Sequence, residues 1–90
     1  MAIIMVAKNT VKDCSVWTTS FDSKKTMRGE FGMHIKSVYQ AKKDPNMCFV
    51  IAKIEDMRRA QEFMKKIQEY GVQEKAGVIA SERMVCNDRT

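Results

Sequence analysis

The sequence predicts an α+β domain in which a four-stranded antiparallel sheet carries helices on one face. Ninety residues can form only one core, because a chain of this length buries only about 60 to 65% of the surface that it exposes when unfolded. Short apolar segments without a helical period alternate with segments whose apolar residues recur every three or four positions. The predicted order is strand, helix, strand, strand, helix, strand, in one domain that spans residues 1–90.

Four segments have the composition or the alternation that is typical of strands. The expected strands are residues 2–8, 33–43, 47–54 and 78–86. The second alternates, with Met33, Ile35, Tyr39 and Ala41 on one face, and is expected at an edge of the sheet. Asp44-Pro45-Asn46 forms a tight turn into the third, which is apolar on both faces.

Two segments are predicted to be helical. Polar residues 9–15 form a turn, with Asp13 or Ser15 as the N-cap of a first helix that ends at Gly29 or Gly32. The second helix follows Asp56 and has the most regular apolar spacing in the chain. It ends or bends at Gly71, and a short helical turn precedes the last strand.

This order resembles a ferredoxin-like sheet with the strand order 4-1-3-2, antiparallel throughout, and both helices on one face. The first and third strands are central in that order, and both are apolar on two faces. The helices cover only one of these faces. A second copy of the chain is the simplest cover for the other, so we expect a homodimer that pairs through its sheets, with Phe49 and Ile51 in the interface.

The sequence also resembles a known group of proteins. The segments are VKDCSVW, VYQAKKDPNMCFVIAKIEDMRRAQEF and KAGV, which lie between residues 11 and 78, so the resemblance spans most of the chain. They are similar to the dimeric α+β-barrel superfamily, and specifically to small proteins of the antibiotic-biosynthesis-monooxygenase group. The resemblance implies two ferredoxin-like chains joined as a barrel, with a pocket between each sheet and its helices. Some members oxidise aromatic polyketides without metal or flavin, and others degrade haem.

Trp17, Phe21 and Phe63 are the candidates for the wall of such a pocket. Aromatic residues at helical spacing are more often ordinary core, and the two roles are compatible under a helical layer. Asn9 and Trp17 are not placed like the Asn, Trp and His set of haem-degrading members, which argues against haem degradation.

His34 is the only histidine and therefore the candidate general acid or base, although a lone histidine on the polar face of an edge strand is more often merely solvated. The predicted hairpin separates His34 from Cys48, and Cys14 and Cys86 are also expected far from it. The three cysteines are interpreted as reduced, small hydrophobic residues. No spacing of ligands predicts a metal site, and no motif predicts a cofactor.

We consider three hypotheses for the function. The first is a dimeric module of unassigned activity that binds a small apolar or aromatic molecule, and the second is a cofactor-independent monooxygenase acting on an aromatic, polyketide-like substrate. The third, an RNA-binding module with the same element order, lacks the basic, aromatic motif on its third strand. The net charge is +5, and the basic residues occur as adjacent pairs dispersed along the chain. Such a distribution favours solubility and does not indicate a specific acidic partner. We expect a cytoplasmic protein without nucleic-acid or membrane partners, because no leader or spanning segment is evident.

Overall fold

The computed structural model describes residues 2–89, which form one four-stranded sheet and four helices. The elements are β1 (Ile3–Val11), α1 (Cys14–Ser23), α2 (Lys25–Glu30), β2 (Met33–Gln40), β3 (Met47–Ile54), α3 (Met57–Glu69), α4 (Val72–Lys75) and β4 (Val78–Asn87).

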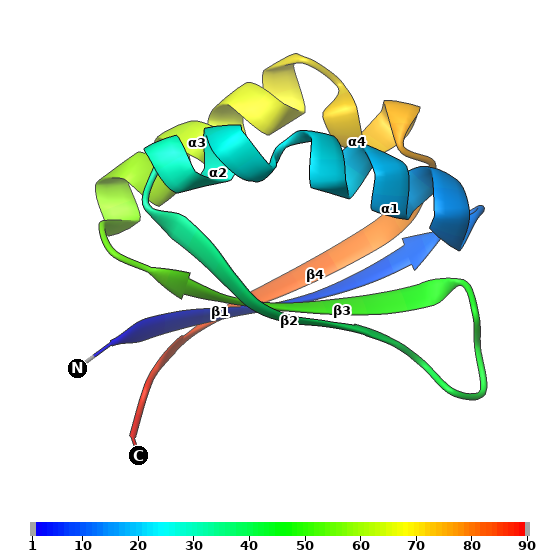
Figure 1. The fold of residues 1–90 in the computed structure, drawn as a ribbon, viewed down its shortest axis with the longest axis horizontal. Coiled ribbons are helices and arrows are strands. Elements are labelled where there is room, and N and C mark those ends of the chain that lie inside the picture. Colours follow the sequence, from blue (N-terminus) through cyan, green and yellow to red (C-terminus); the bar gives the residue numbers. More distant parts are fainter. Residues whose placement is uncertain (1, 90) are drawn as a thin grey trace.

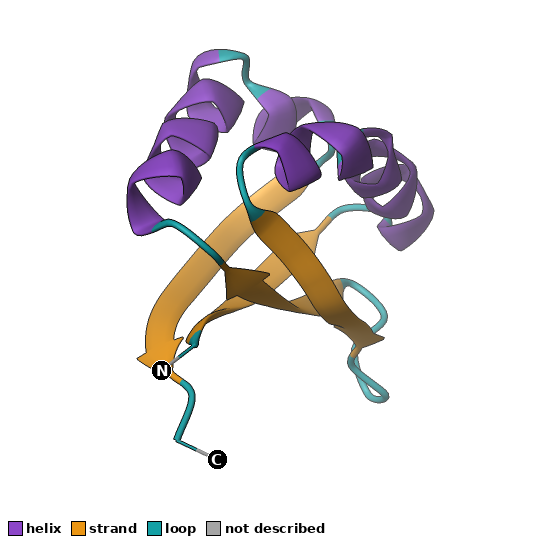
Figure 2. Cartoon of the chain, turned by 60° about the vertical axis from the view of Figure 1, so that its left-hand side comes forward, coloured by secondary structure: helices purple, strands orange, loops and turns teal. Residues whose placement is uncertain are grey.

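The sheet has the order β2-β3-β1-β4, and every neighbouring pair is antiparallel. This is the predicted ferredoxin-like order. All helices lie on one side of the sheet, and no described element covers the other side (Figure 1). The same two layers are visible in a view turned by 60° (Figure 2). The predicted α+β fold class is therefore confirmed.

Strand β1 is longer than predicted, because it continues through Asn9, Thr10 and Val11 where the sequence predicts a turn. Asn9 pairs with Cys48 on one side and with Ser81 on the other. A central strand with partners on both sides can override the turn preference of a single asparagine.

The first helical segment is divided at Lys24 into α1 and α2, whereas the sequence predicts one helix. Asp13 caps α1 as predicted, accepting hydrogen bonds from the main-chain N–H groups of Ser15 and Val16 at 2.8 and 3.4 Å. At its end, the Ser23 hydroxyl donates to the carbonyl oxygen of Ser20 at 2.6 Å. Such local side-chain bonds compete with the helical pattern, which is consistent with a break here.

Strand β2 ends at Gln40, earlier than predicted, and has an irregularity between Ile35 and Ser37. This bulge reverses the alternation of the strand. Val38 therefore pairs with Val50 on the helix side, and Tyr39 pairs with Phe49 on the open side. The prediction that Tyr39 shares a face with Met33 is wrong for this reason.

Helix α3 agrees closely with its prediction. Asp56 accepts hydrogen bonds from the N–H groups of Arg58 and Arg59 at 2.9 and 3.4 Å, so it is the N-cap. Ala60, Phe63 and Ile67 are buried on one face.

The short helix α4 begins after Gly71, which has a φ of 63°. This left-handed conformation favours glycine, and it turns the chain between the two helices as the sequence predicts.

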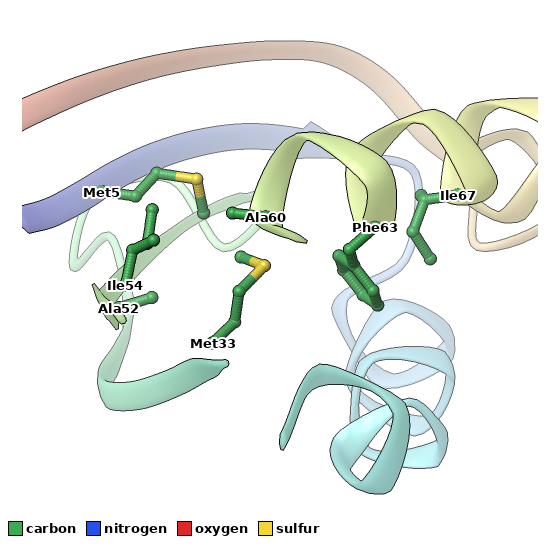
Figure 3. Packing of buried hydrophobic residues seen from close by; sticks show 7 residues of the cluster. All are labelled: Met5, Met33, Ala52, Ile54, Ala60, Phe63 and Ile67. Carbon is green, nitrogen blue, oxygen red and sulfur yellow. The ribbon is translucent and has the colours of Figure 1, made fainter. Parts of the chain in front are cut away.

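The core lies between the helices and the inner face of the sheet. One cluster joins three strands to α3 (Figure 3), and its members are Met5, Met33, Ala52, Ile54, Ala60, Phe63 and Ile67. A second cluster lies around α1, and its members are Ala7, Val11, Trp17, Cys48, Val50 and Ala76. The space that the two clusters leave beneath the helices is the candidate site.

Candidate functional site

A cavity of about 110 Å³ lies between the inner face of the sheet and the helices. Its lining includes Trp17 and Phe21 from α1 and Phe63 from α3, together with residues of all four strands. Phe63 points from α3 toward α1 and α2 (Figure 3). The structure thus brings the three predicted aromatic residues together around one space.

Two of these rings form a stacked pair. Trp17 and Phe21 are one helical turn apart in α1, and their ring centres are 4.9 Å apart with an angle of 22° between the planes. Side chains four residues apart lie on the same face of a helix, which explains the contact. Trp17 is buried in the second core cluster, so it serves both as core and as cavity wall.

Arg28 is a buried residue of this site that was not predicted from the sequence. It is only 6% exposed, and its guanidinium carbon lies 3.9 Å from the centre of the Phe21 ring. Its Nη1 donates a hydrogen bond of 2.6 Å to the carbonyl oxygen of Phe21, whereas its Nε has no partner among residues 2–89. Burial lowers the pKa of Arg28, and the nearby Asp22 carboxylate partly opposes this effect.

The polar groups around the cavity are basic or neutral. Lys24, Arg28 and Arg83 line it, and no aspartate, glutamate or histidine among the described residues does so. Asn9, which is 7% exposed, also lines the cavity and makes no side-chain hydrogen bond within residues 2–89. The wall of the cavity is therefore mostly apolar, with basic side chains and one amide without a hydrogen-bond partner in that range. Such a wall suits an apolar molecule that carries an anionic group.

His34 lies elsewhere. Its side chain is half exposed on β2, and its Nε2 lies 2.9 Å from Oε1 of Glu55, outside the cavity. The structure therefore does not bring His34 together with Trp17 or Phe21.

Neither a metal cluster nor a membrane-spanning helix is found in the described part of the chain. Residues 2–89 contain no group of three or more His, Cys, Asp or Glu side chains that could hold an ion. They also contain no helix that is both long enough and apolar enough to cross a bilayer.

Comparison with known proteins defines the fold. No family model and no curated protein matches the sequence. Among solved structures, the chain is similar to a mutant form of SnoaB, a cofactor-independent oxygenase from Streptomyces nogalater, with a TM-score of 0.78, 14% identity, and 99% and 94% of the two chains covered. An antibiotic biosynthesis monooxygenase matches with a TM-score of 0.72, 8% identity, and 98% and 99% covered.

The fold is that of the antibiotic biosynthesis monooxygenase-like proteins. A NipSnap family protein of unknown function from Agrobacterium tumefaciens also shares it, with a TM-score of 0.70, 8% identity, and 97% and 87% of the chains covered. The fold is thus shared by monooxygenase-like proteins and by proteins of unknown function. The match to the monooxygenase-like group agrees with the resemblance found in the sequence.

Proposed function

We propose that this protein binds a small aromatic molecule with an acidic group in the cavity between sheet and helices. The observation that carries the proposal is the buried guanidinium of Arg28 beside the stacked Trp17 and Phe21 rings. The rings supply an apolar wall for an aromatic body, and Arg28 is the natural partner of a carboxylate or phenolate.

The charge around the cavity supports an anion over a neutral ligand. A buried cation without a carboxylate partner costs free energy, and a bound anion would offset that cost. Arg28 has no carboxylate within salt-bridge distance among the described residues, and Lys24 and Arg83 add positive charge. The Asn9 amide provides a further donor and acceptor.

The cavity size supports a ligand with one ring. A volume of about 110 Å³ is about three quarters of the roughly 150 Å³ of an engineered apolar cavity that accommodates benzene. A one-ring acid is larger than benzene, so the wall has to move outward to admit it, and a ligand with two rings is disfavoured.

The alternative function, a cofactor-independent monooxygenase, has weaker support. Such a reaction needs a base beside the substrate, and His34 lies outside the cavity. No carboxylate among the described lining residues takes its place. Binding is therefore the better supported function.

The homodimer is part of the proposal. Phe49 and Ile51 lie on the sheet face that no helix covers, and Ile51 pairs with Val6, which in turn pairs with Met84. Met84 is 67% exposed in the single chain, so this apolar row crosses three strands in contact with water. A second copy of the chain carries the same apolar row, so pairing of the two sheets would bury both rows symmetrically.

The ligand proposal is tested by titrating the protein with benzoate and benzamide. The two molecules are close in shape and differ in charge, and fluorescence of the single Trp17 reports on the cavity wall. Benzoate is expected to change the fluorescence in a saturable way and to bind at least about tenfold more tightly than benzamide, because a charge-assisted bond contributes more than a neutral one. If neither compound has an effect at millimolar concentration, the ligand class is wrong.

A matched pair of variants assigns the effect to Arg28. Arg28→Met keeps an unbranched apolar side chain and removes the charge, so benzoate affinity should fall to that of benzamide. Arg58→Met removes an exposed arginine of α3 that is absent from the cavity lining, so benzoate affinity should not change. Equal losses in both variants would show that net charge alone attracts the ligand.

A further inference from the structure

Two cysteines that are far apart in the sequence meet beside the second core cluster. The Sγ atoms of Cys14 and Cys48 are 3.3 Å apart, although 34 positions separate the residues in the chain. The sequence predicts reduced, small hydrophobic cysteines, and both thiols are free here, with Cys48 in the second core cluster. Their contact with each other was not predicted.

The contact follows from the topology. Cys48 lies on β3 directly opposite Asn9 of β1, and Cys14 is the first residue of α1, which follows β1 after a short connection. The start of α1 thus lies over β3. A disulfide bond is about 2.05 Å long, so the two sulfur atoms need to approach by only a little more than an ångström to form one.

The two thiols differ in their access to solvent. Cys14 is partly exposed at the start of α1, whereas Cys48 is only 1% exposed. Burial, together with the neighbouring Cys14, raises the pKa of the Cys48 thiol to about 12. Because Cys14 is the more exposed thiol, an oxidant from solution reaches it first. The raised pKa keeps Cys48 protonated at neutral pH, so it is the 3.3 Å contact with Cys14 that favours its reaction with the product.

We propose that Cys14 and Cys48 form a redox pair, in which hydrogen peroxide oxidises Cys14 and Cys48 then closes an intramolecular disulfide. In the first step the Cys14 sulfur attacks one peroxide oxygen, which gives a sulfenic acid and releases water. In the second step the Cys48 sulfur attacks the Cys14 sulfur, the S–O bond breaks, and the Cys48 proton leaves with the hydroxyl group as a second water. Two thiols lose two electrons in total, and one peroxide gains them.

A disulfide between Cys14 and Cys48 would affect the part of the cavity wall that α1 provides. Trp17 lies one turn after Cys14 in α1, and both contribute to the second core cluster. The disulfide would fasten the start of α1 to β3 and so fix the helix that carries Trp17 and Phe21.

Cys86 provides a matched control. It is a partly exposed cysteine on β4, at the position opposite Ile4, where neither Cys14 nor Cys48 is its strand neighbour. A reaction that depends on the Cys14 and Cys48 contact should therefore be unaffected by Cys86→Ser.

The first test is to treat the reduced full chain with hydrogen peroxide and to measure its intact mass and its peptides without reduction. The expected product is a chain lighter by two hydrogen atoms, with the peptides of Cys14 and Cys48 linked within it. Cys86→Ser should give the same product, whereas Cys14→Ser and Cys48→Ser should not. A product linked through Cys86, or oxygen added to Cys14 in the wild-type chain without a disulfide, would overturn the proposal.

The order of the steps is tested by trapping the sulfenic acid with dimedone during oxidation. Cys48→Ser should accumulate roughly tenfold more adduct on Cys14 than the wild-type chain, because it lacks the thiol that consumes the sulfenic acid. Equal amounts of adduct would show that Cys48 does not react with Cys14.

A thermal melt gives a second readout that does not depend on trapping. The disulfide closes a loop of 34 positions in the chain, so the oxidised wild-type chain should melt at least about 5 °C above the reduced chain. Oxidised and reduced Cys48→Ser should show no such rise. A lower melting temperature for the oxidised wild type would mean that the bond distorts the fold, and the pair would then be an adventitious contact.

Discussion

The guanidinium group of Arg28 contacts both the ring and the main chain of Phe21. It lies 3.9 Å from the centre of the Phe21 ring, and its Nη1 donates a hydrogen bond of 2.6 Å to the carbonyl oxygen of the same residue. Phe21 in turn stacks on Trp17. Through this chain of contacts α2 fixes the end of α1, and the break at Lys24 still leaves the two helices firmly joined.

Arg28→Lys should lower the free energy of unfolding by about 1 to 2 kcal/mol. A lysine ammonium cannot both lie flat on the ring and keep the directed hydrogen bond to the carbonyl oxygen. Urea unfolding followed by circular dichroism measures the change. The control Arg58→Lys, on the exposed side of α3, should stay within about 0.5 kcal/mol of the wild type. Equal stability of the two variants would mean that the contacts seen at Arg28 contribute nothing.

Trp17→Ala should lower the free energy of unfolding by about 3 to 5 kcal/mol, because loss of a large side chain from a buried cluster leaves a cavity behind. Trp17→Phe should cost clearly less, since it keeps a ring against Phe21. Circular dichroism is the suitable probe, because both variants lack the only tryptophan. A loss below about 1 kcal/mol in Trp17→Ala would indicate that this wall is not packed.

Asp13→Ala and Asp56→Ala should each lower the free energy of unfolding by about 1 kcal/mol, because each carboxylate accepts hydrogen bonds from two main-chain N–H groups at a helix start. The corresponding Asn variants should retain most of the stability. The two losses should add in the double variant, since the caps belong to different helices. Urea unfolding of the set tests this.

The stability should fall with pH in the alkaline range because of Cys48. The folded thiol has a pKa of about 12, against an ordinary value of 9.0. Between these values the unfolded chain has lost the proton and the folded chain keeps it. The Cys48 thiol therefore contributes its full share of the stability below about pH 9. Above about pH 9 the free energy of unfolding should fall by at most about 1.4 kcal/mol per pH unit.

Cys48→Ala isolates that contribution. Urea unfolding in the presence of a reductant, from about pH 8 to about pH 10.5, should give a shallower decline for the variant than for the wild type. The two proteins differ only at residue 48, so the difference in slope belongs to the Cys48 thiol. Parallel curves would show that the Cys48 thiol titrates alike in the folded and unfolded chains.

If the protein forms the proposed dimer, Ile51→Glu should convert it into a monomer or unfold it, because the substitution places a charge in the centre of the open sheet face. Light scattering of the wild type and the variant measures the mass. The control Arg58→Glu also introduces a glutamate, at an exposed position of α3 on the helix side of the sheet, and should have the same mass as the wild type. A monomeric wild-type chain would contradict the pairing of sheets.

Sequence patterns could predict the fold because its main signals are periodic. Residues of α3 recur on one face, and β3 is apolar on both sides, which together fix the layers and the central strand. The bulge in β2 depends on a single extra residue and leaves no such signal, so the positions of Val38 and Tyr39 could not be predicted.

The candidate site was predictable only in part. Helical spacing predicts that Trp17 and Phe21 share a face, but a single arginine in a polar helix is normally solvated, so Arg28 gave no reason to expect burial. One signal was available, because Arg28 follows Phe21 by seven positions, or about two helical turns. The contact of Cys14 with Cys48 was also within reach, since antiparallel pairing of β1 and β3 places the start of β3 beside the end of β1.

The bulge in β2 also bears on how the chain avoids aggregation. An edge strand with a regular ladder of free N–H and C=O groups can add a strand from another molecule and so begin a fibril. The irregularity between Ile35 and Ser37 interrupts that ladder in the middle of β2, which is one of the two edge strands. Growth of the sheet by edge-to-edge addition at β2 is thereby obstructed.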